Sequence, residues 1–192
     1  FEAMNDALRK SGLPESQVLI LAPHFLTEED VEYFKLNASH VFWSKGGWKI
    51  GHKSKSTDAN PRADRISSFA VLDLMLENLT DRERFSSLET IVLAGHSAGG
   101  QLVNRYSAGS RYLHGLATRF TVRCVVANPS SYVYLDNRRW RDHSLARLEV
   151  PADAKTLCPE YNEYRYGLED LNSYMSATGP DAMRRALGTL DT

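Results

Sequence analysis

The sequence predicts an α/β protein, a three-layer sandwich in which a mostly parallel sheet carries helices on both faces. Short apolar runs that suit strands alternate along the chain with longer helical patterns, which is typical of parallel sheets. These runs are apolar at consecutive positions, as expected for strands covered on both faces. The 192 residues are predicted to form a single domain, because that length is enough for one sizeable core.

The first half of the chain predicts helices around one buried strand. Residues 1–11 suit a helix, because their apolar side chains share one face and a glycine follows. Residues 17–21 (Q-V-L-I-L) form a short apolar run and are predicted to be a strand. A helix is expected after Thr27, which would cap it, since three acidic residues follow. Residues 65–79 are predicted to be a strongly apolar helix that packs against the sheet.

A long irregular stretch, residues 37–62, interrupts this pattern with three glycines and a proline. One interpretation is a lid or pocket wall in which Trp43 and Trp48 face an apolar ligand. The alternative is a surface loop whose tryptophans pack onto the core. Its basic residues predict either an anionic ligand or a solvated face. They are Lys45, Lys49, His52, Lys53 and Lys55.

The centre of the sequence predicts a buried strand, a sharp turn and a helix in direct succession. The strand is expected over 90–94 and the helix over 98–109. The turn between them reads Gly95-His96-Ser97-Ala98-Gly99, which matches the G-x-S-x-G pattern of a nucleophile elbow. Both glycines of the pattern are expected at positions where a Cβ would clash. His96 is expected to pack, because neighbouring residues leaving a strand point to opposite sides.

The elbow pattern predicts chemistry at Ser97. A strained strand-to-helix turn exposes the serine hydroxyl, which still needs an adjacent base to act as a nucleophile. The backbone N–H of Ala98 would donate to an oxyanion at the start of the helix. The alternatives are a glycine-rich turn with an exposed serine, or a helix start that binds an anion.

The second half of the chain offers candidate partners for Ser97. A buried strand is expected over 122–127, followed by a turn at Asn-Pro-Ser-Ser, and a last helix over 181–187. Asp136 follows the strand-like 132–135 and is a candidate acid, with ordinary turn chemistry as the alternative. His143 is a candidate base, with a surface histidine as the alternative.

Three segments, V-L-I-L-A-P-H-F, I-V-L-A-G-H-S-A-G-G-Q and V-V-A-N-P-S-S-Y, resemble the α/β-hydrolase fold, in particular esterases, lipases and polyhydroxybutyrate-depolymerase-like proteins. The resemblance covers most of residues 1–135. It implies a carboxylesterase-type serine hydrolase with Ser97 as nucleophile and the Ala98 N–H in the oxyanion hole. The substrate implied is a small-molecule or polymeric ester.

The sequence departs from that family at both ends. The loop that would supply a second oxyanion donor precedes residue 1, and no closing strands carry a clear acid and histidine. The chain is therefore expected to be a fragment, with the rest of the fold on another chain or outside this sequence. The alternative hypothesis is a non-catalytic α/β-hydrolase-like binding or interaction protein.

Composition excludes several other functions. A net charge of −1 argues against nucleic-acid binding, and no apolar run reaches the length of a membrane span. No motif predicts a cofactor or a metal. Cys124 is expected to be a buried small hydrophobe, and a bridge to Cys158 stays open. The glycosylation triplets at Asn37 and Asn78 favour a secretory compartment, without excluding the cytoplasm.

Overall fold

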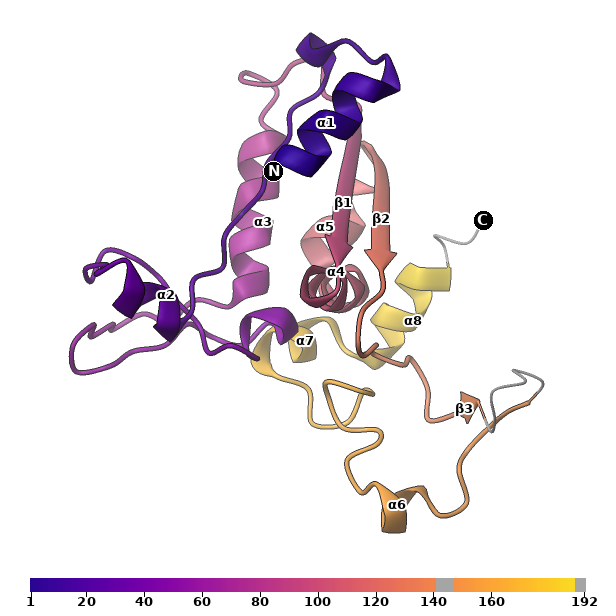
Figure 1. The fold of residues 1–192 in the computed structure, drawn as a ribbon. Helices are drawn as coiled ribbons and strands as arrows, with labels where there is room; N and C mark the ends of the chain where they lie inside the picture. The colour runs from indigo at the N-terminus through magenta and orange to yellow at the C-terminus, as the bar shows by residue number, and fades with distance from the viewer. Residues whose placement is uncertain (141–146, 189–192) are drawn as a thin grey trace.

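The computed structural model describes residues 1–140 and 147–188 and shows a mixed α/β fold (Figure 1). At its centre, strands β1 (Thr90–His96) and β2 (Thr121–Ala127) form a parallel two-stranded sheet. The chain crosses from one strand to the other through helices α4 (Ala98–Gly109) and α5 (Arg111–Leu116). The strands predicted over 90–94 and 122–127 and the helix over 98–109 are confirmed, because their apolar runs and glycine punctuation are strong local signals.

The remaining elements are short and lie around this unit. They are α1 (Glu2–Ser11), η1 (Glu15–Gln17), α2 (Glu28–Tyr33), η2 (Trp48–Ile50), α3 (Ser68–Leu79), β3 (Arg139–Trp140), β4 (Leu148–Glu149), α6 (Ala154–Leu157), α7 (Ser173–Thr178) and α8 (Pro180–Gly188). Thr27 caps α2 through a capping box with Asp30, as predicted. Helix α3 begins three residues later than expected because Ser67 caps it by accepting from the Phe69 N–H.

The predicted strand over 17–21 is wrong. The 3₁₀ turn η1 occupies Glu15–Gln17, and the following residues are irregular although Val18 is extended (φ −130°, ψ 124°). Leu19 and Leu21 are exposed. A strand is defined by pairing, and this segment pairs with no strand of the described chain. An apolar run by itself does not supply the partner.

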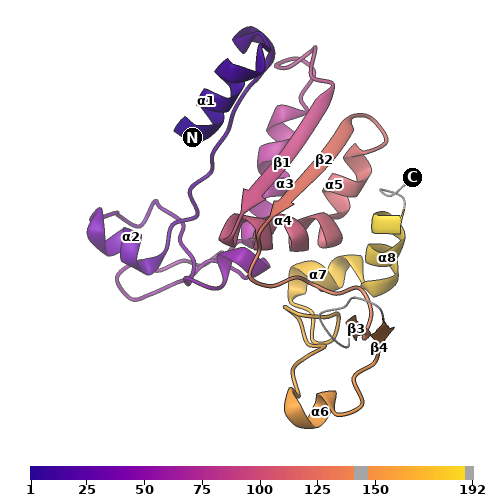
Figure 2. The same cartoon turned by 45° about the vertical axis from the view of Figure 1, so that its right-hand side comes forward.

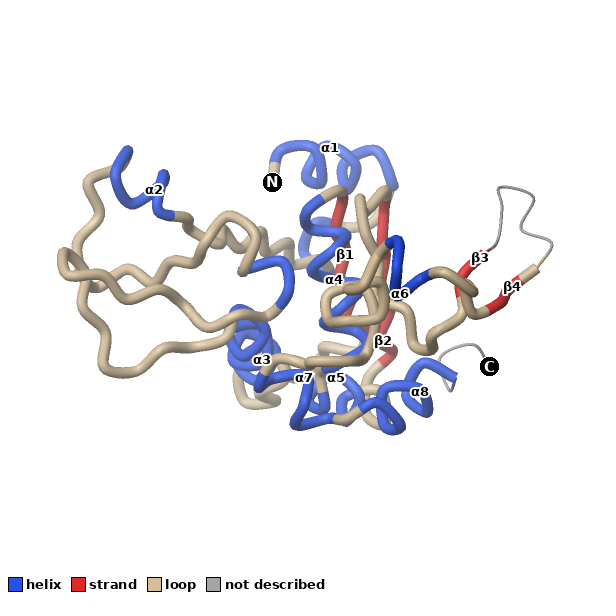
Figure 3. The backbone as a smooth tube through the Cα atoms, turned by 90° about the horizontal axis from the view of Figure 1, so that it is seen from below, coloured by secondary structure: helices blue, strands red, loops and turns tan. Residues whose placement is uncertain are grey.

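The sheet is covered mainly on one face. Helices α3, α4 and α5 bury Ile91 of β1 in a common core that also takes in Met175 of α7 and Met183 of α8. Helix α1 lies on the opposite side of the strands (Figure 3). On that side Val92 and Val125 remain 56% and 50% exposed. Burial therefore alternates along both strands, and the expected cover on both faces is only partly present.

Asp73 of α3 joins three helical segments to one another. Its Oδ1 accepts hydrogen bonds from Tyr106 Oη and Ser110 Oγ at 2.8 Å each, and its Oδ2 accepts from Tyr174 Oη at 2.6 Å. These donors lie in α4, at the cap of α5 and in α7. Tyr106 is fully buried, and this burial, followed by the nearby carboxylate, raises the pKa of its phenol.

The two tryptophans of residues 37–62 pack onto Phe25. Trp43 is buried, donates its indole N–H to the His52 carbonyl at 3.0 Å, and meets Phe25 edge-on at 5.5 Å. Trp48 stacks on the same ring at 5.6 Å. This arrangement matches the alternative in which the tryptophans tuck onto the core.

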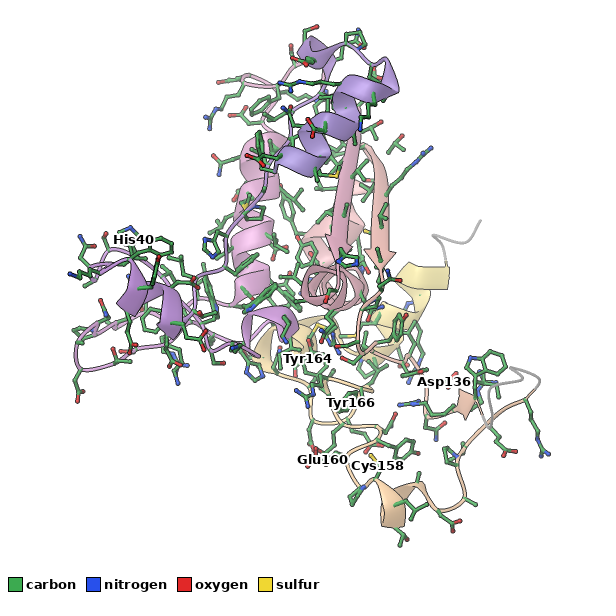
Figure 4. The ribbon with its side chains drawn as sticks, in the orientation of Figure 1. His40, Asp136, Cys158, Glu160, Tyr164 and Tyr166 are labelled. Carbon is green, nitrogen blue, oxygen red and sulfur yellow. The ribbon has the colours of Figure 1, made fainter. Side chains whose placement is uncertain are left out.

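Both cysteines are free thiols. Cys124 is half-buried in β2, and burial raises the pKa of its thiol to about 11. Cys158 is exposed near α6 (Figure 4). Within residues 1–140 and 147–188, no helix combines the length and the apolar character needed to cross a membrane.

Stability should fall in alkali because of Tyr106. In the unfolded chain this phenol ionises near its ordinary value of 10, whereas burial keeps it protonated in the folded state. Above that pH the folded state binds more protons, so unfolding becomes easier by about 1.4 kcal/mol per pH unit. We expect Tyr106→Phe to remove this contribution, so that the free energy of unfolding declines less steeply with pH. Urea unfolding between about pH 9 and 11, one unit either side of the ordinary pKa, measures the decline.

The matched control is Tyr33→Phe, because that ring is 80% exposed. This variant should keep the slope of the native protein. Equal slopes for native protein and Tyr106→Phe would contradict the assignment.

Candidate functional site

The turn between β1 and α4 is made by a single residue. β1 ends at His96 and α4 begins at Ala98, with exposed Ser97 between them. Ser97 has φ 54° and ψ −113°, a combination that costs a non-glycine residue about 1–3 kcal/mol. Figure 2 shows the carboxyl ends of both strands arriving at α4. The serine therefore lies at the strand end where parallel α/β proteins place their ligands.

Two glycines permit the backbones to approach one another here. A Cβ on Gly95 would overlap the carbonyl group of Gly99 in the first turn of α4. A Cβ on Gly100 would lie 2.7 Å from the carbonyl oxygen of Ala127 in β2. The expectation of a clash is wrong for Gly99, whose Cβ would meet nothing within 4 Å. The Cβ position of Gly99 faces away from the strands, whereas that of Gly100 faces β2.

Hydrogen bonds fix the elbow to the segment after β2. The Ser97 N–H donates to the Ala127 carbonyl at 2.9 Å, and the Gln101 N–H donates to the Ser97 carbonyl at 3.0 Å. The side chain of Gln101 then donates to Ser130 Oγ at 3.0 Å and accepts from Ser131 Oγ at 3.1 Å. Residues from two strand ends therefore hold the serine in place.

Arg105 extends this network one turn further along α4. Its guanidinium is fully buried and donates to the Gln101 carbonyl (3.1 Å), to Ser131 Oγ (2.9 Å) and twice to the Arg165 carbonyl (3.0 and 3.2 Å). No carboxylate of the described chain hydrogen-bonds it, and burial lowers its pKa. Neutral oxygens therefore hold the segment around residue 165 against the elbow helix.

The Ala98 N–H is suited to an electrostatic role. As the first residue of α4, Ala98 has no carbonyl four residues earlier in the helix to bond. The amide also lies at the positive end of a 12-residue helix dipole. This position can stabilise negative charge that develops on an atom bound at Ser97.

The described histidines form no hydrogen bond with Ser97, and three of them have other partners. His96 is exposed, so the expectation that it packs is wrong. His114 Nε2 lies 2.7 Å from the Ser107 carbonyl, and His24 lies 3.7 Å from Asp30. His40 hydrogen-bonds within its own loop, far from α4 in Figure 4. None of these, nor His52, hydrogen-bonds Ser97.

The candidate base His143 lies outside the described residues. The candidate acid Asp136 is described, and the strand expected before it, over 132–135, is not formed. Its carboxylate accepts from the Arg138 backbone N–H at 2.7 Å and from the Arg138 guanidinium at 2.6 Å. These bonds hold the pKa of Asp136 below its usual value. Asp136 lies near β3 in Figure 4 and is not joined to Ser97 by any hydrogen bond.

No protein-family model matches the chain, and searches of curated proteins and of solved structures found no match. In the described part of the chain, no three histidine, cysteine, aspartate or glutamate side chains gather as metal ligands would. The geometry of the elbow is therefore the basis for a functional proposal.

Several residues that build the site were not singled out from the sequence. They are Gly100, Gln101, Arg105, Ser130 and Ser131. The available signal was the pair of polar residues Gln101 and Arg105, four apart in the helix, because positions i and i+4 share a face. The hydrogen-bond partners of Gln101 and Arg105 are 29, 26 and 60 residues away along the chain. Local sequence patterns do not indicate partners at such separations.

The two glycines of the motif should respond differently to alanine. Gly95→Ala places a methyl group against backbone atoms that cannot move aside, so we expect a loss of about 3 kcal/mol or more in the free energy of unfolding. Gly99→Ala meets open space in a helix and should gain about 0.5–1 kcal/mol. Urea unfolding of both variants tests this, and equal effects at the two positions would contradict the elbow packing.

Proposed function

We propose that this protein is a serine hydrolase of the carboxylesterase type, acting on a carboxylic ester or a related acyl bond. The single observation that carries the proposal is the conformation of Ser97, exposed and held at φ 54° between a strand and a helix. Strain of this kind persists only where the surroundings impose it, and it is concentrated at active sites. The proposal includes an α/β-hydrolase fold of three layers, of which the parallel unit around α4 would be the centre.

In this mechanism Ser97 Oγ attacks the acyl carbon while a histidine removes the hydroxyl proton. The carbonyl oxygen becomes an oxyanion that accepts a hydrogen bond from the Ala98 N–H. A single donor of this kind stabilises the transition state by about 3 kcal/mol. The leaving alcohol takes the proton from the histidine, and water then hydrolyses the acyl-serine by the same steps. Substrates would be small-molecule or polymeric esters.

A second candidate function is a non-catalytic binding or interaction protein with the same fold. It is favoured by a specific observation, since no described histidine hydrogen-bonds Ser97 and Asp136 is held by Arg138. A serine without a base retains only part of the catalytic machinery, about 10³–10⁴-fold over water when the oxyanion hole is intact.

Fluorophosphonate labelling of the native full-length protein distinguishes the two. We expect one adduct, located at Ser97 by peptide mapping, because only an activated serine reacts rapidly with such probes. Ser97→Ala should abolish the adduct. The exposed Ser86 provides a matched control, and Ser86→Ala should label as the native protein does. Absence of an adduct at Ser97 would favour the binding function.

Asp136→Asn tests whether Asp136 is the triad acid. Because Arg138 already engages its carboxylate, we expect Ser97 labelling to proceed at the native rate. Loss of a true triad acid lowers the rate by about 10⁴-fold. A loss of that size in the labelling rate, measured on samples quenched at successive times, would show that Asp136 leaves Arg138 and orients the base.

A further inference from the structure

A hollow of about 460 Å³ lies at the end of α4 that is opposite to Ser97. It is bounded by the first half of α3, the start of α5 and helix α7, which lie close together in Figure 3. Gly109, the last residue of α4, lines it, whereas Ala98 begins the helix. Eleven steps of helical rise separate these residues by about 17 Å. The hollow is therefore distinct from the elbow.

Three cationic side chains line this hollow, namely Lys53, Arg65 and Arg111. Within the described chain, neither the Lys53 ammonium nor the Arg111 guanidinium forms a hydrogen bond or an ion pair. Arg65 donates its Nε–H to the Ser54 carbonyl, which leaves its two terminal nitrogens available. Neighbouring lysines behave differently, since Lys45 pairs with Glu29 and Lys55 with Glu28 at 3.2 and 3.5 Å.

The one carboxylate in the wall forms no ion pair with these cations and offsets only one of their three charges. Both oxygens of Asp73 are occupied by the hydroxyls of Tyr106, Ser110 and Tyr174 described above. Three positive charges against one negative charge leave the lining with two positive charges. Like charges collected around one concave surface raise the local concentration of anions.

We propose that this hollow binds a small phosphate monoester. A phosphate monoester carries close to two negative charges at neutral pH, which matches the lining. Two arginines and a lysine supply the forked and single donors that phosphate oxygens accept. The volume lies within the range of small-molecule sites and exceeds the need of a bare anion. Ala70, Ala177 and the ring of Tyr174 form an apolar part of the wall for the organic group.

The arrangement of one loop and two helices brings these three cationic side chains to the same hollow. Lys53 belongs to residues 37–62 and forms an antiparallel bridge with Ser67, which caps α3. Arg65 precedes that cap by two residues, and Arg111 opens α5. The site thus joins the lysine-rich loop to two helix starts, and of that loop's basic residues only Lys53 contributes.

Isothermal titration calorimetry of the native protein with phenyl phosphate at low ionic strength tests the proposal. We expect saturable one-to-one binding that inorganic phosphate displaces. Benzoate, which has the same ring and one negative charge, should bind at least about tenfold more weakly. No binding of phenyl phosphate, no displacement by phosphate, or equal binding of benzoate would each overturn the proposal.

Matched variants locate the site. Arg111→Gln and Lys53→Gln should each weaken phenyl phosphate about tenfold, because each removes one charge-assisted contact. Lys55→Gln, two residues from Lys53 but paired with Glu28, should bind as the native protein does. Ser97→Ala should also leave binding unchanged, which separates this site from the start of α4. Equal weakening by Lys55→Gln, or loss of binding in Ser97→Ala, would overturn the assignment, with thermal unfolding confirming that each variant is folded.

Discussion

The close approach of Gly95 to the first turn of α4 is the constraint on which the centre of this protein depends. Because no Cβ separates these backbones, the chain passes from strand to helix through one residue. Ser97 makes this turn with a positive φ, and its N–H donates to the Ala127 carbonyl of β2. Gly100 lets β2 approach from the other side. The strain at Ser97 is thus a consequence of how the two strands and α4 pack.

Arg105 connects α4 to segments further along the chain, at Ser131 and Arg165. A buried guanidinium without a carboxylate partner is costly unless every donor finds an acceptor. Here the acceptors are the Gln101 carbonyl in the same helix, and the Arg165 carbonyl and Ser131 hydroxyl on segments distant in sequence. The segment around residue 165 has little regular structure, so hydrogen bonds from the Arg105 guanidinium, rather than strand pairing, hold it against α4. Asp73 has the same function at the other end of α4, where it gathers hydroxyls from three helical segments.

The parts of the fold that could be predicted are those encoded locally. The strand, turn and helix around Ser97 follow from an apolar run, a glycine pair and a helical period. The strand expected over 17–21 failed because its apolar run has the right composition but no paired edge. The sequence allows two interpretations of Trp43 and Trp48, because nothing in the local pattern shows that both pack on Phe25. The sequence pattern assigns the close approach to Gly99, and only the position of β2 shows that the adjacent Gly100 is the residue that must lack a side chain.

Activation of Ser97 requires a base, and most of the described histidines are engaged elsewhere. His114 is bonded to a helix carbonyl, His24 lies beside Asp30, and His40 is held in its own loop, so recruiting any of them would break an existing contact. His96 is exposed but adjacent in sequence, and neighbouring strand residues face opposite ways. None of these histidines, nor His52, hydrogen-bonds Ser97, so a base for the proposed nucleophile would have to be brought to the open side of the turn. Ser97 is already exposed and its backbone already fixed by the Ala127 carbonyl, so what the proposed reaction still requires is the base, the acid that orients it and a second oxyanion donor.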